Sequence, residues 1–199
     1  MIRDLVFDIG RVIIDIDPEP MLELLATRGA PRLNLHDMLE QIGINEHETG
    51  RMDGAGLIER LRTLAPQATP AELRAQWLEM FAPQADMIQL THRIAPHHGV
   101  YLLSNIGPLH WEHLVDRHGI AGIGHGALTS FHAGVMKPDS AIYAQAEQKF
   151  ALVPAMTVFV DDRPENIEAA RARGWHGIVH RNFNDTRQAL LRLGVEAAG

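Results

Sequence analysis

The sequence contains no cysteine, which excludes disulfide bonds, thiolate metal sites and cysteine nucleophiles. It also lacks any apolar run long enough to cross a lipid bilayer. Arg3 and Asp4 stand directly before the first apolar segment, so we expect no signal peptide. These absences predict a cytoplasmic protein with no membrane partner.

Positive charge is scarce as well. The chain has 25 acidic residues against 18 basic ones, and its formal net charge is −7. This balance disfavours a surface for the phosphate backbone of nucleic acid and favours a small-molecule partner. Sixteen of the basic residues are arginines and only two are lysines, so a lysine within a motif is not the compositional default.

One carboxylate stands out at the end of the first apolar run. The segment Leu5-Val6-Phe7-Asp8-Ile9-Gly10 has the pattern of a buried strand that delivers Asp8 to the point where glycine frees the backbone. An acid in such a place carries a large desolvation penalty unless it is partnered. Asp8 is therefore the first candidate for a functional residue.

The pattern after this strand predicts a helical insert. We expect the strand itself to continue over residues 12–14, after which the apolar residues follow a helical period. Thr69-Pro70-Ala71-Glu72 is a capping-box sequence at a helix start, and Gly50, Gly54 and Gly56 predict a loop. The expected helices are 19–28, 34–42, 56–64 and 69–81.

From residue 85 onward, expected strands and helices alternate. The strands are 100–103, 157–160 and 177–179, and the helices are 86–94, 109–117, 140–150, 164–173 and 186–193. Residues 196–199 are expected to fray. Such alternation predicts an α/β fold, a doubly wound parallel sheet with helices on both faces. We expect residues 1–14 and 85–199 to form this core and residues 15–84 to form an inserted α-helical cap domain.

Three later segments carry polar residues that can join Asp8 in one site. Ser104-Asn105 and Asp161-Asp162 each follow an apolar run, and Lys137 lies between them in the sequence. Because the carboxyl ends of parallel strands converge on one crevice, these distant residues can form a single site. Together the four segments predict a catalytic centre.

The same segments resemble the four motifs of the haloacid dehalogenase-like hydrolase superfamily, over the whole chain. They occur in the family order as Asp8-Ile9-Gly10-Arg11-Val12, Leu102-Leu103-Ser104-Asn105, Lys137-Pro138-Asp139 and Val160-Asp161-Asp162. The first motif is most similar to the subgroup that reads Phe-Asp-x-Gly-x-Val, which includes sugar-phosphate phosphatases. The resemblance implies a Rossmann-like core, and a cap whose closure excludes water and selects the substrate.

The resemblance also implies a Mg²⁺-dependent phosphatase of small phosphorylated metabolites. Asp8 would attack phosphorus in line and form an aspartyl-phosphate that water hydrolyses. Mg²⁺ would be bound by Asp8, Asp162 and the backbone carbonyl of Gly10, with Asp161 acting through water or pairing with Lys137. Asn166 would orient the metal-bound waters.

Substrate contacts follow from the same resemblance. Ser104 and the backbone N–H of Asn105 would hold the phosphoryl oxygens, and Lys137 would neutralise charge on Asp8 and the phosphate. Arg11 either contacts the substrate, points to solvent or pairs with an acid of the insert.

One position departs from the family pattern. Phosphatases of this superfamily carry a second aspartate two residues after the nucleophile, acting as general acid and base, and here that position is Gly10. General acid–base help contributes about 10²–10⁴-fold to the rate. Three explanations are open: an acidic leaving group such as an anomeric sugar phosphate, loss of turnover, or an acid supplied from elsewhere. The candidates for such an acid are Asp15, Asp17, His47 and Glu48.

Two other functions therefore stay open. Dehalogenases of the superfamily also lack the second aspartate and use no metal, so a 2-haloacid dehalogenase is the chemical alternative. A catalytically weak module that binds phosphorylated metabolites or a protein partner is the other. The pair Asp161-Asp162 favours the phosphatase, because it is suited to a divalent cation.

Each candidate residue also has a purely structural interpretation. Asp161-Asp162 and Ser104-Asn105 could cap the helices that follow them. Lys137 could be a solvated surface lysine. His110 and His113 share a helical face and would suit zinc, but no third ligand stands at a convincing spacing. Tryptophans 77, 111 and 175 are expected to pack, with Trp111 close enough to Asn105 to line an entrance.

Overall fold

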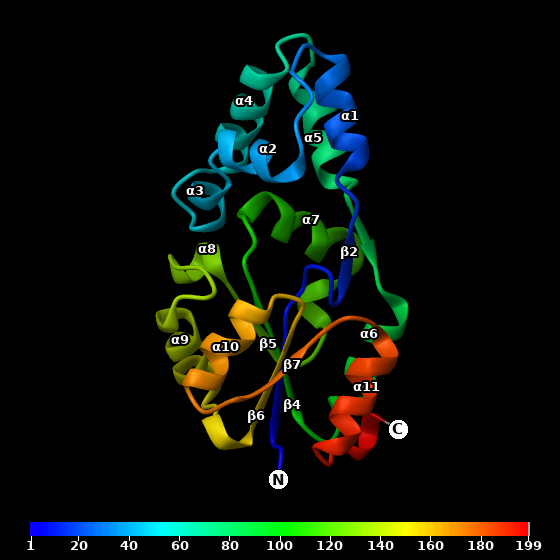
Figure 1. Ribbon diagram of the computed structural model, residues 1–199, viewed down its shortest axis with the longest axis vertical. Coiled ribbons are helices and arrows are strands. Elements are labelled where there is room, and N and C mark those ends of the chain that lie inside the picture. Colours follow the sequence, from blue (N-terminus) through cyan, green and yellow to red (C-terminus); the bar gives the residue numbers. More distant parts are fainter. Residues whose placement is uncertain (199) are drawn as a thin grey trace.

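The computed structural model describes residues 1–198 and shows a sheet domain below a group of helices (Figure 1). The sheet has five strands in the order β5-β4-β1-β6-β7, and every neighbouring pair is parallel. The bounds are β1 (Asp4–Phe7), β4 (Gly99–Ser104), β5 (Gly126–Thr129), β6 (Thr157–Asp161) and β7 (His176–Val179). The predicted α/β fold with a parallel sheet is confirmed.

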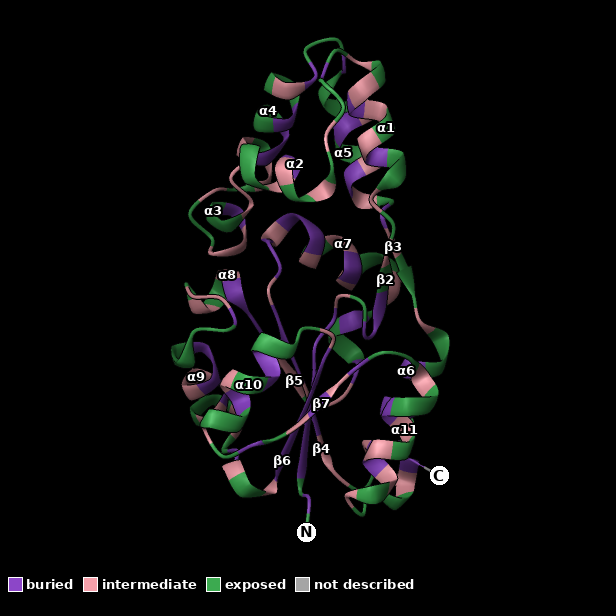
Figure 2. Cartoon of the chain, in the orientation of Figure 1, coloured by how far each residue is buried: buried purple, intermediate pink, exposed green. Residues whose placement is uncertain are grey.

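Helices cover both faces of this sheet. Side chains alternate along each strand, so each strand contributes apolar residues to the packing on both faces. Leu5 and Phe7 of β1 lie in one hydrophobic cluster, and Val6 between them lies in another. The first cluster includes residues of α6 (Ala85–Ile94), α7 (Pro108–His118) and α11 (Phe183–Arg192). The second includes residues of α9 (Ser140–Phe150) and α10 (Pro164–Ala172). Figure 2 shows the strands buried and the outer helix faces exposed.

Strand β1 ends at Phe7 and does not continue over residues 12–14, so this prediction was wrong. The backbone N–H groups of Ile13 and Ile14 both donate to the carbonyl of Ile9, which closes a turn in which Arg11 has a φ of 57°. Residues 12–14 are apolar because their own side chains are fully buried, and not because they extend β1.

A two-stranded antiparallel ribbon follows the turn. Strand β2 (Ile14–Ile16) pairs with β3 (Phe81–Pro83), and Ile16 lies opposite Phe81. Helix α5 (Pro70–Leu78) therefore ends earlier than predicted, because Phe81 is recruited by this ribbon. The predicted capping box at Thr69 and Glu72 is present. The ribbon carries the chain out of the sheet domain and back.

The helices between β2 and β3, which we call the cap helices, have a hydrophobic core of their own. They are α1 (Glu19–Thr27), α2 (Leu35–Gln41), α3 (Ile44–Glu48), α4 (Gly54–Leu64) and α5. Met21, Met38, Leu61 and Trp77 are at most 1% exposed within this cluster. Helix α3 was not predicted, and Gly54 and Gly56 lie in the first turn of α4 and not in a loop.

Short elements complete the chain. They are α8 (Ser130–Ala133) and the 3-10 turns Ile120–Gly122, Pro154–Met156 and Glu196–Ala198. The last of these was expected to fray, but Ala198 is buried and its carbonyl accepts a hydrogen bond from Arg187 Nε. Gly199, the last residue of that expectation and of the predicted core, lies outside the described residues. Among residues 1–198, no helix is long and apolar enough to cross a membrane.

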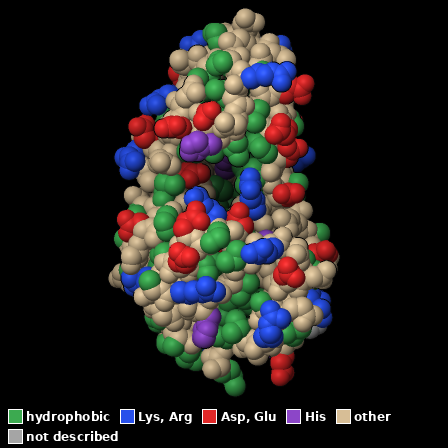
Figure 3. Space-filling view, in the orientation of Figure 1, with side chains coloured by type: hydrophobic (Ala, Val, Ile, Leu, Met, Phe, Trp, Pro, Cys, Tyr) green, Lys and Arg blue, Asp and Glu red, His purple; other side chains and the backbone are tan. Residues whose placement is uncertain are grey.

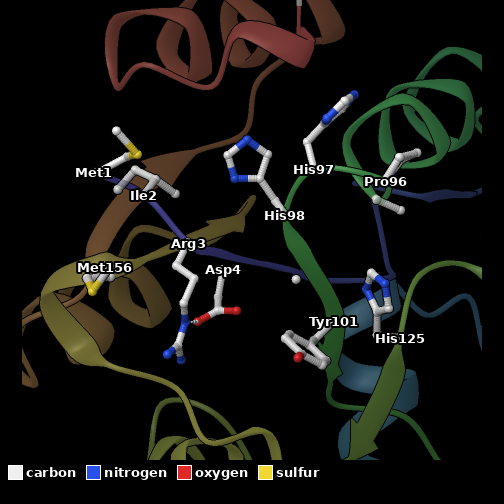
Figure 4. A pocket seen from close by; sticks show the side chains of 12 residues that line it. Met1, Ile2, Arg3, Asp4, Pro96, His97, His98, Tyr101, His125 and Met156 are labelled. Atoms are coloured by element: carbon white, nitrogen blue, oxygen red, sulfur yellow. Dashed lines mark hydrogen bonds and ion pairs between the residues drawn. The ribbon is translucent and has the colours of Figure 1, made fainter.

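A hollow of about 640 Å³ opens at the amino ends of the central strands (Figure 4). Its lining includes Arg3, Asp4, His98, Tyr101 and His125. Asp4 begins β1 and is paired with Arg3, whose Nε lies 2.6 Å from the Asp4 carboxylate. This hollow is at the edge of the sheet opposite to the strand ends that carry Asp8 and Asp161.

The cap cluster generates a stability prediction. Trp77 is 1% exposed and stacks on His110 of α7, with ring centroids 4.8 Å apart. Trp77→Ala should lower the free energy of unfolding by about 3–5 kcal/mol, because it leaves a cavity where the cap helices meet α7. Urea unfolding measures this loss. Arg74→Ala, at an exposed position of the same helix, is the control and should change it by less than about 0.5 kcal/mol; equal effects would contradict this packing.

Candidate functional site

The parallel register brings the candidate residues to one edge of the sheet. Phe7 lies opposite both Leu102 and Val160, so Asp8, Ser104 and Asp161 follow at neighbouring strand ends. Asp8, Ser104 and Asp161 are all buried. The sheet therefore brings these three residues to the same edge, as expected from the sequence.

Lys137 joins two of these carboxylates. Its ammonium Nζ lies 2.9 Å from Asp8 Oδ1 and 2.6 Å from Asp161 Oδ2. It also donates to the backbone carbonyl of Leu103 at 2.9 Å, so all three N–H donors have an acceptor. Lys137 is 3% exposed, which rules out the solvated surface lysine.

Asn105 holds Lys137 in this position through its side chain. The backbone N–H of Lys137 donates to Asn105 Oδ1 at 2.8 Å, and Asn105 Nδ2 donates to the carbonyl of Lys137 at 2.9 Å. The sequence assigned Asn105 only a backbone role, because nothing in its local pattern indicates this long-range pair. Helix α7 begins after Gly107 without a side-chain cap, so the capping role for Ser104-Asn105 is wrong.

Asp161 is the most heavily bonded acid of the group. Besides Lys137, it accepts hydrogen bonds from the backbone N–H of Arg163 at 2.8 Å and from Asn166 Nδ2, which lies 3.0 Å from both carboxylate oxygens. The N-cap residue of α10 is Arg163, not an aspartate. The purely structural interpretation of Asp161-Asp162 as a helix cap is therefore wrong.

Three carboxylates gather here, and two of them contact the ammonium of Lys137. Oxygens of Asp8, Asp161 and Asp162 lie within 4.8 Å of one another. Burial raises the pKa of Asp8 to about 6, although Lys137 opposes the shift. Burial, reinforced by Asp161, also raises the pKa of Asp162. For Lys137, burial alone would lower the pKa, but Asp8 and Asp161 outweigh it and the pKa is raised. Such an excess of oxygen anions suits a divalent cation.

Arg11 lies beside this cluster. Its positive charge lowers the pKa of Asp162, although burial and Asp161 outweigh this effect. The exposed side chain of Arg11 also lines an open groove together with Asp15 and Arg181. A Cβ at Gly10, the residue before it, would lie 3.1 Å from Ile16 Cδ1, so a larger residue there would displace Ile16 slightly.

One cap helix reaches the site. The carbonyl of Glu48, the last residue of α3, accepts a hydrogen bond from Ser130 Oγ at 2.5 Å. Ser130 Oγ in turn accepts from the backbone N–H of Ile106 at 3.0 Å, two residues after Ser104. Figure 3 shows the surface hollowed where the cap helices meet the sheet domain, with acidic and basic side chains at the rim.

The other singled-out aromatic and histidine residues pack. His110 lies between Trp77 and Phe81, its Nε2 is 3.1 Å from the carbonyl of Trp77, and burial lowers its pKa to about 3. It is therefore a packing residue, and no zinc site forms around it in residues 1–198. Trp111 packs against the core cluster, and Trp175 donates to Glu147.

A comparison with family models identifies the protein family of the chain. The model of the haloacid dehalogenase-like hydrolases matches residues 6–174. The chain belongs to this family. The predicted family membership, and with it a hydrolase, is confirmed. All four motif segments lie within the matched residues.

Two characterised relatives of this hydrolase are phosphatases. The chain is 28% identical to D-ribitol-5-phosphate phosphatase from Bacteroides thetaiotaomicron, over 96% of this chain and 97% of that one. It is 33% identical to a sesquiterpene phosphatase from Aspergillus oryzae, over 40% of each chain.

Solved structures share the fold of this hydrolase. A family enzyme from Bacteroides thetaiotaomicron, crystallised with magnesium and inorganic phosphate, has a TM-score of 0.81 at 21% identity and covers 91% of this chain and 95% of its own. L-2-haloacid dehalogenase from Xanthobacter autotrophicus has a TM-score of 0.64 at 16% identity, covering 96% of this chain and 83% of its own. At these identities the likeness concerns the fold alone.

The bridging ammonium generates a prediction for this hydrolase. Lys137→Met should lower the free energy of unfolding by about 3–5 kcal/mol, because it leaves Asp8 and Asp161 buried without a cation. Urea unfolding in metal-free buffer measures the change. The only other lysine of the chain is exposed, and Lys149→Met is the matched control that should be nearly neutral. A Lys137→Met protein as stable as the control would mean that the ammonium does not hold the site together.

Proposed function

We propose that this hydrolase is a Mg²⁺-dependent phosphatase of small phosphorylated metabolites, with sugar and sugar-alcohol phosphates as its substrate class. The observation that carries the proposal is the cluster of Asp8, Asp161 and Asp162, two of which are paired with the buried ammonium of Lys137. The similarity to a D-ribitol-5-phosphate phosphatase over nearly the whole of both chains supports the substrate class.

The residues present fit a magnesium ion. Mg²⁺ prefers oxygen ligands and retains several waters. The three carboxylates supply the oxygens, and the buried Oδ1 of Asn166 has no hydrogen-bond partner within residues 1–198, as expected for an atom that faces a metal-bound water. We assign Asp8, Asp162 and the carbonyl of Gly10 as ligands, with Asp161 acting through water. Bound there, Mg²⁺ would neutralise charge between the phosphate and the nucleophile.

The reaction itself starts at Asp8. With a pKa of about 6, its carboxylate is mostly ionised at neutral pH and can attack phosphorus in line, forming an aspartyl-phosphate as the ester oxygen leaves. Lys137 holds the attacking carboxylate in place and offsets its charge. The hydroxyl of Ser104 and the backbone N–H of Asn105 hold the phosphoryl oxygens, and Arg11 contacts the substrate from the side of Asp162.

The assignment of residues to a core domain and a cap domain belongs to the same proposal. Residues 1–14 and 85–199 form the catalytic core, and residues 15–84 form the cap that closes over the strand ends. A cytoplasmic location and the absence of a nucleic-acid or membrane partner stay predictions from composition.

One assay separates the candidate functions. It measures phosphate release from sugar phosphates, sugar-alcohol phosphates and an aryl phosphate, with Mg²⁺ or with a chelator, alongside halide release from 2-haloacids. We expect phosphate release that the chelator abolishes and Mg²⁺ restores. Halide release without metal would establish the dehalogenase instead, and silence in every assay would leave only the binding module.

The nucleophile has its own test. Asp8→Asn should lower turnover by at least about a thousandfold, because an amide cannot form the aspartyl-phosphate. Circular dichroism should show an unchanged fold. Asp4→Asn, the same replacement at the other end of β1, is the control and should keep wild-type activity. An Asp8→Asn enzyme that is equally active would contradict the mechanism.

A further inference from the structure

We propose that Glu48 is the general acid that protonates the leaving oxygen, and then the base that activates water, in place of the carboxylate missing at Gly10. The assignment rests on the proposed phosphatase function. It makes a residue of the cap helices a catalytic residue and means that the site is complete only when the cap lies on the core.

The first argument is where the backbone holds Glu48. Its carbonyl is bonded to Ser130 Oγ, which is also bonded to the loop that follows β4. Figure 1 shows α3 as the cap helix next to α8, where Ser130 lies. This contact between segments 82 residues apart fixes the end of α3 beside the residues that would bind the phosphoryl group.

Two glycines allow this close approach. A Cβ at Gly107, in the loop after β4, would lie 2.1 Å from the ring of His47. A Cβ at Gly50 would lie 2.7 Å from the carbonyl oxygen of Phe131. Both distances are shorter than any real contact, so only glycine lets the α3 segment sit this close to the core.

The second argument is the charge around the Glu48 carboxyl. Asp8 at the end of β1, Lys137 before α9 and Arg163 before α10 all act on it electrostatically. Yet within residues 1–198, Glu48 forms no ion pair and no side-chain hydrogen bond with other residues. Its carboxyl therefore lies within the electrostatic influence of Asp8 and Lys137 and is free to bond to a substrate atom.

In-line attack decides which substrate atom that is. The leaving oxygen departs on the side of phosphorus opposite to the attacking carboxylate. Asp8 attacks from the sheet, so the leaving oxygen points toward the cap helices, where Glu48 lies.

Burial favours the form of Glu48 that this role needs. Burial raises the pKa of Glu48 to about 7, and Asp8 adds to the shift, while Lys137 and Arg163 oppose it. A large fraction of Glu48 is thus a neutral acid at neutral pH, and a proton donor with such a pKa is well matched to its task.

The other candidate acids fit the role less well. The carboxylate of Asp15 accepts from the backbone N–H of Ile16, and that of Asp17 accepts from Glu19 at the start of α1; both aspartates are exposed. His47 Nδ1 lies 2.9 Å from the carbonyl of Met52, and burial lowers the pKa of His47, which disfavours its protonated form. Its Nε2 has no partner within residues 1–198, but it lies against Gly107, where a Cβ would be 2.3 Å away.

The proton balance is complete with these groups. As the bond from Asp8 to phosphorus forms and the bond to the leaving oxygen breaks, the electron pair passes to that oxygen, which takes the proton of Glu48. The Glu48 carboxylate then takes a proton from the water that attacks the aspartyl-phosphate. Inorganic phosphate leaves, the electron pair returns to Asp8, and Glu48 is again protonated.

The test compares Glu48→Gln with wild type on two esters in the presence of Mg²⁺. A sugar-alcohol phosphate has a leaving group that needs a proton, whereas an aryl phosphate has one that does not. For Glu48→Gln we expect the first turnover to slow by about 10²–10⁴-fold on the sugar-alcohol phosphate. On the aryl phosphate the first turnover should stay near the wild-type rate and give a burst of one phenolate per site, followed by slow steady-state release.

The control is Glu46→Gln on the same helix, where an exposed glutamate pairs with Arg60; it should behave as wild type on both esters. Equal slowing of both first turnovers by Glu48→Gln would overturn the proposal, since it would indicate a structural role. Wild-type rates on both esters would overturn it too. An inactive wild-type enzyme would instead contradict the phosphatase function, so the two failures are distinguishable.

Discussion

The site depends on one buried ammonium held between two carboxylates. Lys137 Nζ lies within 3 Å of both Asp8 and Asp161 and is shielded from solvent. Because an unpaired buried charge is costly, each of these residues constrains the others. The parallel pairing of β1 with β6 sets the spacing of the two acids, and the side chain of Asn105 fixes the lysine. The carboxylate of Asp8 is thereby held in place before any substrate binds.

The cap helices add a carboxyl group at the edge of the sheet where the clustered acids lie. The sheet supplies the three clustered carboxylates of the site, but at Gly10 it supplies no proton donor. Ser130 and Gly107 bring α3 to the same edge, where Glu48 experiences the field of Asp8. Proton transfer would then require the cap to rest on the core, which couples chemistry to the exclusion of water.

The sequence predicts the parts of this arrangement that local pattern encodes. Apolar runs that end in Asp8, Ser104 and Asp161 identify the strand ends, and parallel pairing makes them converge. Contacts between distant segments are not encoded locally. The Asn105–Lys137 pair and the recruitment of Phe81 by β2 are of this kind. The apolar residues 12–14 predicted a strand, because buried residues at the end of a turn have the same composition as a buried strand. Helix α3 was not predicted, because its five mostly polar residues show no clear helical period of apolar positions.

The most direct measurement of the central claim is to trap the covalent intermediate. The enzyme is mixed with an aryl phosphate and Mg²⁺, quenched in acid within the first turnover, and analysed by peptide mass spectrometry. We predict one added phosphoryl group, located on the peptide that contains Asp8 and released by mild base, as expected for an acyl-phosphate. Turnover without any phosphorylated peptide, or a phosphoryl group on another residue, would contradict Asp8 as the nucleophile.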